Sequence, residues 1–231
     1  MDGEREFTGG ELAGLLEWWV DAGVDVAVAE EPRNWLNPPP KPSTPDANIA
    51  EPSHDTLAQL QDWLAGSAQL PLASASARRI RPHGPENAAV MLLSDAPALE
   101  DLASGQPIGG EAWALAGRML AAIGIPADQA YSASLTCFHS PGARMTDDDR
   151  AACAQLARKH VALVKPKFLL LLGDGPCKAV LGQPLPAARG HVHKVEGVRT
   201  VATFHPRWLL QRPSDKAKAW SDLLLLMEND V

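Results

Sequence analysis

Cysteine is scarce in this chain, and long apolar runs are missing from it. Only three cysteines, Cys137, Cys153 and Cys177, occur among 231 residues, too few and too scattered for a disulfide framework. None of them lies in a Cys-x-x-Cys pair, which argues against a metal site built from cysteines. No apolar run approaches the ~18 residues of a membrane-spanning helix, so we expect no contact with a membrane.

The sequence also begins without the basic and then apolar layout of a secretion signal. Its first six residues hold three acids and one base, which is not the composition of such a signal. We therefore expect a cytoplasmic protein, and we expect it to be a monomer.

The net charge of -7 conceals an uneven distribution. Residues 1–55 carry twelve acids and three bases, whereas residues 158–218 carry twelve lysines or arginines and three acids. A basic second half is typical of a surface that faces phosphate groups. Ordinary solvated helix faces would give the same composition, and charge alone leaves both interpretations open.

The chain is predicted to consist of three parts. Residues 1–31 form an acidic extension whose apolar residues at helical spacing indicate a short amphipathic helix. Residues 32–54 form a proline-rich linker that can build neither helix nor sheet. Residues 55–231 form the main domain, which opens with a helix capped by Ser53 or Asp55.

Within the main domain, predicted strands alternate with predicted helices. The strands are expected at residues 87–94, 131–137, 167–173 and 198–204, and the later helices at 111–123, 147–164, 177–181 and 214–227. Such alternation favours a three-layer α/β/α fold around a central, mainly parallel sheet of four strands.

Two side chains at predicted strand ends are candidates for chemistry. His205 ends the last strand and precedes a proline, and Asp95 ends the first strand. The carboxyl ends of parallel strands are where open α/β sheets place their sites. A histidine there can donate a hydrogen bond to a developing anion, and a carboxylate can orient water. The alternative for His205 is a histidine that is satisfied by backbone groups in a turn, and the alternative for Asp95 is helix or turn capping.

Two further patterns are weaker. His191 and His193 point the same way on an extended segment, but no carboxylate or cysteine stands at ligand spacing, so we expect no metal site. The glycine-rich turn at residues 105–110 opens a helix, where backbone N–H groups can meet a phosphate. It lacks the lysine and hydroxyl of a P-loop.

Taken together, several segments resemble family 4 uracil-DNA glycosylases. Residues 91–98, 100–101 and 105–109 resemble the motif G-E-A-P-G, then E-D, then G-x-P-F-V-G. Residues 131–134 and 139–144 resemble Y-I-T-N and R-P-P-G-N-R, and residues 204–210 resemble H-P-A-Y-L-L. The resemblance covers residues 57–228 in order and implies the glycosylase fold, DNA as partner, and hydrolysis of the bond between a deaminated base and its sugar.

The resemblance assigns roles to individual residues. It implies Asp95 and His205 as catalytic residues; Ala96, Pro97, Ile108 and Ser134 as the base pocket; and Gly109, Arg144, Arg189 and Arg207 as DNA contacts. His205 would stabilise the uracil anion, and Asp95 would position water or stabilise the cationic sugar.

The sequence departs from the family pattern at several of these positions. Asp95 stands in place of glutamate, Ile108 in place of the stacking phenylalanine, Ser134 in place of the base-reading asparagine, and Ala143 in place of another asparagine. Isoleucine cannot stack on a base as phenylalanine does, a loss of ~1–3 kcal/mol. A serine hydroxyl cannot pair bidentately with the uracil edge.

The family generally holds a 4Fe-4S cluster on four cysteines. Only Cys153 matches a ligand position; Phe138 occupies another, and residues 67–70 supply none. Because a cluster needs its thiolates, we expect none here.

Two hypotheses of function follow. The chain is a divergent glycosylase acting on uracil or another deaminated base in DNA, or it is a weak or inactive relative that keeps the fold and binds DNA. The acidic residues 1–55 either compete with DNA for the basic half of the chain or form a solvated extension.

Overall fold

The computed structural model describes residues 55–73, 77–139 and 145–228. These residues belong to one compact unit, residues 53–231. The predicted acidic extension and proline-rich linker, residues 1–54, lie outside the described residues, as does Arg144.

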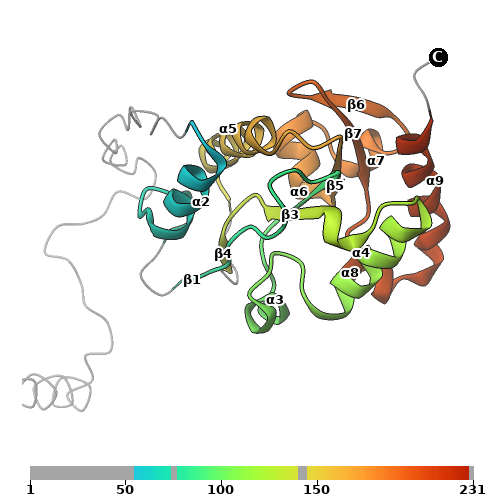
Figure 1. Cartoon of the computed structure of the whole chain (residues 1–231), viewed down its shortest axis with the longest axis horizontal. Helices are drawn as coiled ribbons and strands as arrows, with labels where there is room; N and C mark the ends of the chain where they lie inside the picture. The colour runs from blue at the N-terminus through green and yellow to red at the C-terminus, as the bar shows by residue number, and fades with distance from the viewer. Residues whose placement is uncertain (1–54, 74–76, 140–144, 229–231) are drawn as a thin grey trace, which may run out of the picture. The chain divides into compact units, whose positions relative to one another are not determined.

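The centre of the unit is a sheet with strand order β3-β2-β5-β7-β6 (Figure 1). The strands β2, β3, β5 and β7 are parallel, and β6 is antiparallel to β7. Their bounds are β2 Val90–Ser94, β3 Ala130–Ser134, β5 Phe168–Leu172, β6 Val192–Val195 and β7 Val198–Thr203. The four predicted strands are the parallel ones.

The predicted count of four strands was wrong by one, because β6 adds to the edge of the sheet. Glu196 and Gly197 connect β6 to β7 with φ values of 49° and 80°. Two successive residues with positive φ form the tight turn whose twist suits a two-residue hairpin. Glutamate rarely adopts that conformation, so the pair Glu196-Gly197 is a weaker turn signal than Asn-Gly or Asp-Gly.

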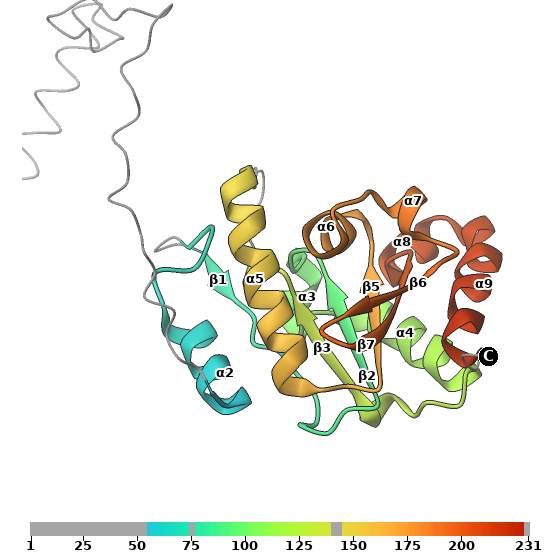
Figure 2. The same cartoon turned by 90° about the horizontal axis from the view of Figure 1, so that it is seen from above.

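Alternating residues of the strands enter cores on opposite faces of the sheet. Met91 and Leu93 pack on one face, mainly against α5 (Asp147–Val164). Val90 and Leu92 pack on the other, mainly against α4 (Gly110–Ala122) and α9 (Lys216–Met227). Figure 2 shows α5 and α4 on opposite sides of the strands. The three-layer prediction is therefore confirmed.

The helix ends follow local sequence signals. Thr146 caps α5 by accepting the N–H of Asp149 at 3.1 Å, while the Asp149 carboxylate accepts the N–H of Thr146 at 3.0 Å. The same reciprocal arrangement joins Thr56 and Gln59 at the start of α2 (Leu57–Gly66). Thr56, rather than Ser53 or Asp55, is the cap.

Shorter elements complete the unit. They are β1 (Arg78–Arg79), α3 (Leu99–Ser104), η1 (Ala127–Gln129), β4 (Phe138–His139), α6 (Asp174–Pro176), the π-helical turn η2 (Cys177–Leu181), α7 (Leu185–Ala188), α8 (Pro206–Gln211) and η3 (Pro213–Asp215). The predicted strand at 131–137 is thus split, and its last part leads into β4, which pairs with β1.

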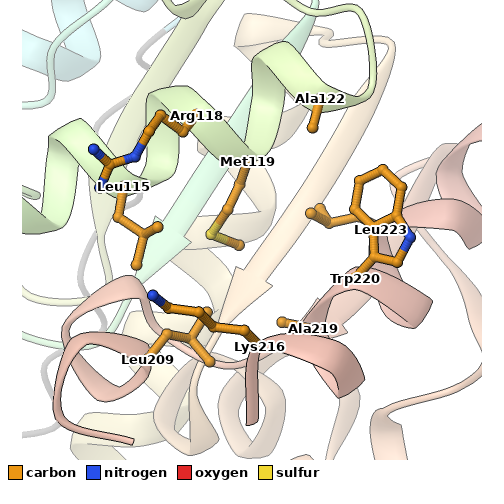
Figure 3. Close-up of a pocket in the computed structure, with 9 residues that line it drawn as sticks. All are labelled: Leu115, Arg118, Met119, Ala122, Leu209, Lys216, Ala219, Trp220 and Leu223. Atoms are coloured by element: carbon orange, nitrogen blue, oxygen red, sulfur yellow. The ribbon is translucent and has the colours of Figure 1, made fainter. Parts of the chain in front are cut away.

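An open, largely apolar groove of about 200 Å³ lies between α4, α8 and α9 (Figure 3). Leu115, Met119 and Leu223 line it, with Arg118 and Lys216 beside them. None of the lining residues is a predicted site residue. Within the described part of the chain, no helix has both the length and the apolar character needed to cross a membrane.

Candidate active site at the carboxyl edge of the sheet

Four neighbouring parallel strands end at the edge that carries the candidate residues. Asp95 follows β2, Ser134 ends β3, Gly173 follows β5 and His205 follows β7. Because β5 separates β2 from β7, Asp95 and His205 stand two strand spacings apart, roughly 10 Å at ~4.8 Å per spacing. One small substrate can therefore reach both side chains.

The loop after β5 contacts both candidate catalytic residues. A Cβ on Gly175 would lie 2.4 Å from Cγ and Oδ1 of Asp95, and a Cβ on Gly173 would lie 3.9 Å from Cβ of His205. Real Cβ atoms do not approach other atoms as closely as 2.4 Å, so the Asp95 carboxylate occupies space that only glycine leaves. Gly175 was not among the predicted site residues, although its place after a buried strand was a signal.

Asp95 is exposed, yet its carboxyl group is partly removed from water. That desolvation, and next the negative charge of Asp174, raise its pKa, while Arg150 lowers it. Asp174 itself is paired with Lys178. The direction of the shift makes Asp95 a better proton acceptor than an ordinary surface aspartate, although water at this exposed position screens the effect.

His205 is held in one tautomer by the helix that it caps. Its Nδ1 accepts the backbone N–H of Arg207 at 3.1 Å, at the start of α8. An Nδ1 that accepts must be unprotonated, so the ring proton of neutral His205 is on Nε2. Nε2–H is then a hydrogen-bond donor that this cap leaves available.

Burial keeps His205 neutral. Desolvation, and next the positive charge of Arg207, lower its pKa to about 4, while Asp101 acts in the opposite direction. At neutral pH the ring is therefore a neutral donor rather than a cation.

The glycine-rich turn is hydrogen-bonded to Asp101, a motif residue for which the sequence predicted no role. Asp101 is fully buried, and its Oδ1 accepts the N–H of Gly109 at 2.7 Å. The N–H that could have met a phosphate thus already has an anionic partner within the protein.

The predicted base-pocket residues have different environments. Ala96 is exposed, whereas Pro97 is buried and its carbonyl accepts a hydrogen bond from Nδ1 of His139 at 2.8 Å. Ile108 is fully buried in the same apolar cluster as Val90 and Leu92. The structure therefore places Ile108 within the core, with no exposed surface on which a base could stack.

Ser134 lies beside β2, at the same level as Ser94. Its Oγ is buried and has no hydrogen-bond partner among the described residues. A buried hydroxyl without a partner is costly, and a bound ligand with a donor or acceptor at this point would satisfy it.

Two predicted DNA contacts already have carboxylate partners. Arg189 pairs bidentately with Asp222, through Nε at 2.8 Å and Nη2 at 3.1 Å, and stacks over Phe204. Nη2 of Arg207 donates to Oδ2 of Asp101 at 2.7 Å. Both arginines thus join separate elements of the protein, in addition to any contact that they make with DNA.

The residues at the expected cluster positions do not fit an iron–sulfur cluster. Phe138 lies in an apolar cluster with Leu70 and Cys137, and the Arg79 guanidinium stacks 4.7 Å from its ring centroid. Burial raises the pKa of Cys137 to about 11 and, together with nearby acids, that of Cys153 to about 12. Phe138 offers no ligand atom, and Cys153 is the one expected position that supplies a thiol, whereas a cluster of this kind takes four thiolates.

Other metal ligands do not converge in the part of the chain that the structure describes. No group of three or more His, Cys, Asp or Glu side chains is placed there to hold an ion. His193, one of the two histidines considered in the sequence, donates from Nε2 to the carbonyl of Ala188 at 2.8 Å.

Comparison with known proteins agrees with the motifs and the fold. Residues 81–224, more than half of the chain, match the model of the uracil DNA glycosylase superfamily. The type-4 uracil-DNA glycosylase of Archaeoglobus fulgidus is 24% identical over 150 residues, which are 60% of this chain and 75% of that protein. The type-4 uracil-DNA glycosylase of Thermotoga maritima is 22% identical over 134 residues, 56% of this chain and 70% of that protein. The chain therefore belongs to the uracil-DNA glycosylase superfamily.

Proposed function

We propose that the protein hydrolyses the N-glycosidic bond of uracil, or of another deaminated base, in DNA, as the first step of base excision repair. The observation that carries the proposal is the neutral His205, whose Nδ1 accepts the Arg207 N–H, at the same sheet edge as the carboxylate of Asp95. Family membership and the names of the two type-4 relatives support the reaction class.

In this reaction the bond between C1′ of the sugar and N1 of uracil breaks, and its electron pair leaves with the base. Negative charge then develops on uracil O2, and Nε2–H of His205 donates a hydrogen bond to it. A neutral donor with a depressed pKa suits this role, because it stabilises the anion through a fixed hydrogen bond and keeps its proton.

Asp95 acts on the sugar side. Its negative charge stabilises the cationic sugar, and its carboxylate orients the water whose oxygen attacks C1′. One proton of that water passes to the carboxylate and then to solvent, leaving a hydroxyl on C1′. The uracil anion takes a proton from solvent when it leaves the site. A raised pKa favours this transfer.

The base must leave the DNA stack before it can reach the edge. We assign Ala96, Pro97, Ser134 and the surface above Ile108 to its pocket, with the unpartnered Ser134 Oγ as the group that reads the base. Gly109, Arg144, Arg189 and Arg207 remain proposed DNA contacts, Gly109 through backbone atoms other than its N–H, which donates to Asp101. No iron–sulfur cluster takes part in this proposal.

A second candidate function is DNA binding without turnover. It is favoured by the complete burial of Ile108, which withholds a stacking surface, and by the single hydroxyl of Ser134 in place of an amide. Both features weaken recognition of the base more than they weaken the chemistry.

A release assay separates the two functions. Oligonucleotides with one uracil, single-stranded and double-stranded, are incubated with wild type and with His205→Ala, and abasic sites are cleaved with alkali. We expect release by the wild type and a loss of about 10²–10³-fold in the variant. Equal background cleavage by both proteins would overturn the glycosylase proposal for uracil, and salt-sensitive binding without release would support the second function.

A further inference from the structure

Asp101 takes no part in bond breaking, yet its buried carboxylate joins three segments of the edge. Oδ2 accepts the N–H of Ala98 at 2.6 Å, in the loop that follows Asp95. Oδ1 accepts the N–H of Gly109 at 2.7 Å, next to Ile108. Oδ2 also accepts Nη2 of Arg207 at 2.7 Å, two residues after His205.

The ion pair between Asp101 and Arg207 is connected to His205 through the backbone of Arg207. The Arg207 side chain ends on Asp101, while its backbone N–H donates to Nδ1 of His205. Fixing the side chain therefore fixes the first residues of α8 and the N–H that selects the tautomer. Arg207 stands where the family motif H-P-A-Y-L-L has alanine, so the motif itself does not supply this ion pair.

The pair is well shielded from water. The side chain of Asp101 is 1% exposed and that of Arg207 25% exposed. Glu100 approaches Arg207 more loosely, with its Oε2 3.5 Å from Nε, and its own side chain is 75% exposed. Nε of Arg207 is buried and makes no hydrogen bond within the described residues, so Asp101 is the close partner that holds the guanidinium.

We propose that Asp101 and Arg207 are positioning residues that hold His205 as the Nε2–H tautomer at a fixed place relative to Asp95. That this positioning serves catalysis rests on the proposed glycosylase function. The tautomer and position of the His205 ring do not depend on that function, because they are present without substrate.

The first test is nuclear magnetic resonance of the histidine side chains, with His205→Ala to identify the resonance. In the wild type, ring nitrogen shifts should report unprotonated Nδ1 and protonated Nε2 at neutral pH. Arg207→Ala should mix the tautomers and raise the pKa of His205, because a positive charge that lowers it is gone. Arg207→Lys, which keeps that charge, should retain most of the low pKa.

The second test is kinetic. Asp101→Asn should lower kcat for uracil release about tenfold with KM changed less than twofold, because positioning is felt in the transition state. Arg207→Ala should lower kcat to a similar extent and also raise KM, because Arg207 is a proposed DNA contact as well. Arg212→Ala is the matched control: it removes a positive charge from the end of the same helix, where Arg212 stacks on Trp208, and should leave both constants unchanged.

Unchanged tautomer and pKa of His205 in Arg207→Ala and Asp101→Asn would overturn the proposal. If the wild type releases no uracil, the glycosylase function fails, while the resonance measurements still decide on the positioning role. If Arg207→Ala is unfolded, Asp101→Asn carries the comparison: it should mix the tautomers and lower the pKa of His205 further, because the negative charge that raises it is gone.

Discussion

At the scale of single residues, Gly175 limits the position of Asp95 most directly. The carboxylate lies where any side chain on residue 175 would begin. The family glutamate is one methylene longer than Asp95. The loop after β5 lies so close to residue 95 that the shorter aspartate side chain fits there more easily. The positions of Gly175 and Asp95 therefore depend on each other.

Gly175→Ala is expected to push the Asp95 carboxylate away and lower the uracil-release rate by about 10²-fold, since a misplacement of ~1 Å can cost that much. Single-turnover release measures the effect. Gly66→Ala is the control, because a Cβ there meets no atom within 4 Å. A Gly175→Ala rate within twofold of the wild type would show that the contact does not position Asp95.

His160 provides a residue-scale test that needs no substrate. Its Nε2 lies 2.8 Å from the Tyr131 hydroxyl, which also accepts a hydrogen bond from Gln61 at 2.8 Å. The hydroxyl therefore donates to a neutral ring. Burial lowers the pKa of His160 to about 4 from an ordinary value of 6.5.

Between pH 6.5 and about 4, the unfolded chain binds a proton at His160 that the folded chain does not. The free energy of unfolding should therefore fall as the pH is lowered through this window, by up to about 3 kcal/mol from His160. His205 should contribute in the same direction. Urea unfolding of His160→Gln, which removes one titrating group, should show a shallower fall; the same slope as in the wild type would contradict the assignment.

The sequence indicated Asp95 and His205 because each ends an apolar strand and stands close to a proline. It could not indicate what Asp101 does. That carboxylate contacts backbone groups in its own loop but also Arg207, 106 residues away, and no local pattern encodes such a pair. The burial of Ile108 could not be predicted either. A glycine-rich turn has no periodic pattern, so the sequence does not indicate whether an apolar residue within it faces the core or the solvent.

At the scale of elements, local signals placed most helices and strands. Helix α5 was predicted with its observed bounds, and three acids mark its start. Thr146 before it and Pro166 after it are further local signals that agree with these bounds. The strand β5 is a run of leucines bounded by Pro166 and Gly173. Strand β6 was missed because it is short and polar, and it forms by pairing with β7 rather than by its own propensity.

Helix α9 is tied to the strand that leads to His205. Asp222, 1% exposed, accepts both Arg189 hydrogen bonds and a third from Oγ1 of Thr203 at 2.8 Å, at the end of β7. Asp222→Ala leaves a partly buried guanidinium without its partner. It should lower the free energy of unfolding by about 3–5 kcal/mol in urea titration.

Asp147→Ala is the control for Asp222→Ala. Asp147 pairs with Arg150 at 2.6 Å, but its side chain is 95% exposed, so the loss should stay below about 1 kcal/mol. Equal losses in the two variants would mean that the Asp222 pair contributes no more than a surface pair.

At the scale of the whole molecule, the unit should fold without iron. In the region of the expected cluster, Arg79 donates to the carbonyls of Leu64 at 3.1 Å and Ser67 at 2.5 Å while stacking on Phe138. These contacts link α2, β1 and β4 through ordinary side-chain interactions. Because they need no metal, we expect stability to be independent of iron.

Protein purified anaerobically from iron-supplemented and from iron-depleted cells should have the same melting temperature and no iron–sulfur absorption. Arg79→Met should lower the melting temperature of both preparations alike, since it removes two hydrogen bonds to backbone carbonyls. A brown protein, or a melting temperature that falls on iron depletion, would contradict the absence of a cluster.

The central claim is that Asp95 and His205 form one site that breaks a glycosidic bond in DNA. The most direct measurement is the single-turnover rate of uracil release for wild type, Asp95→Asn, His205→Ala and the double variant, on one uracil-containing oligonucleotide. Each single change should lower the rate by about 10²-fold or more, and the double variant should lose much less than the product of the two, because residues that act as a unit are not additive. Release by either single variant at the wild-type rate would contradict the claim.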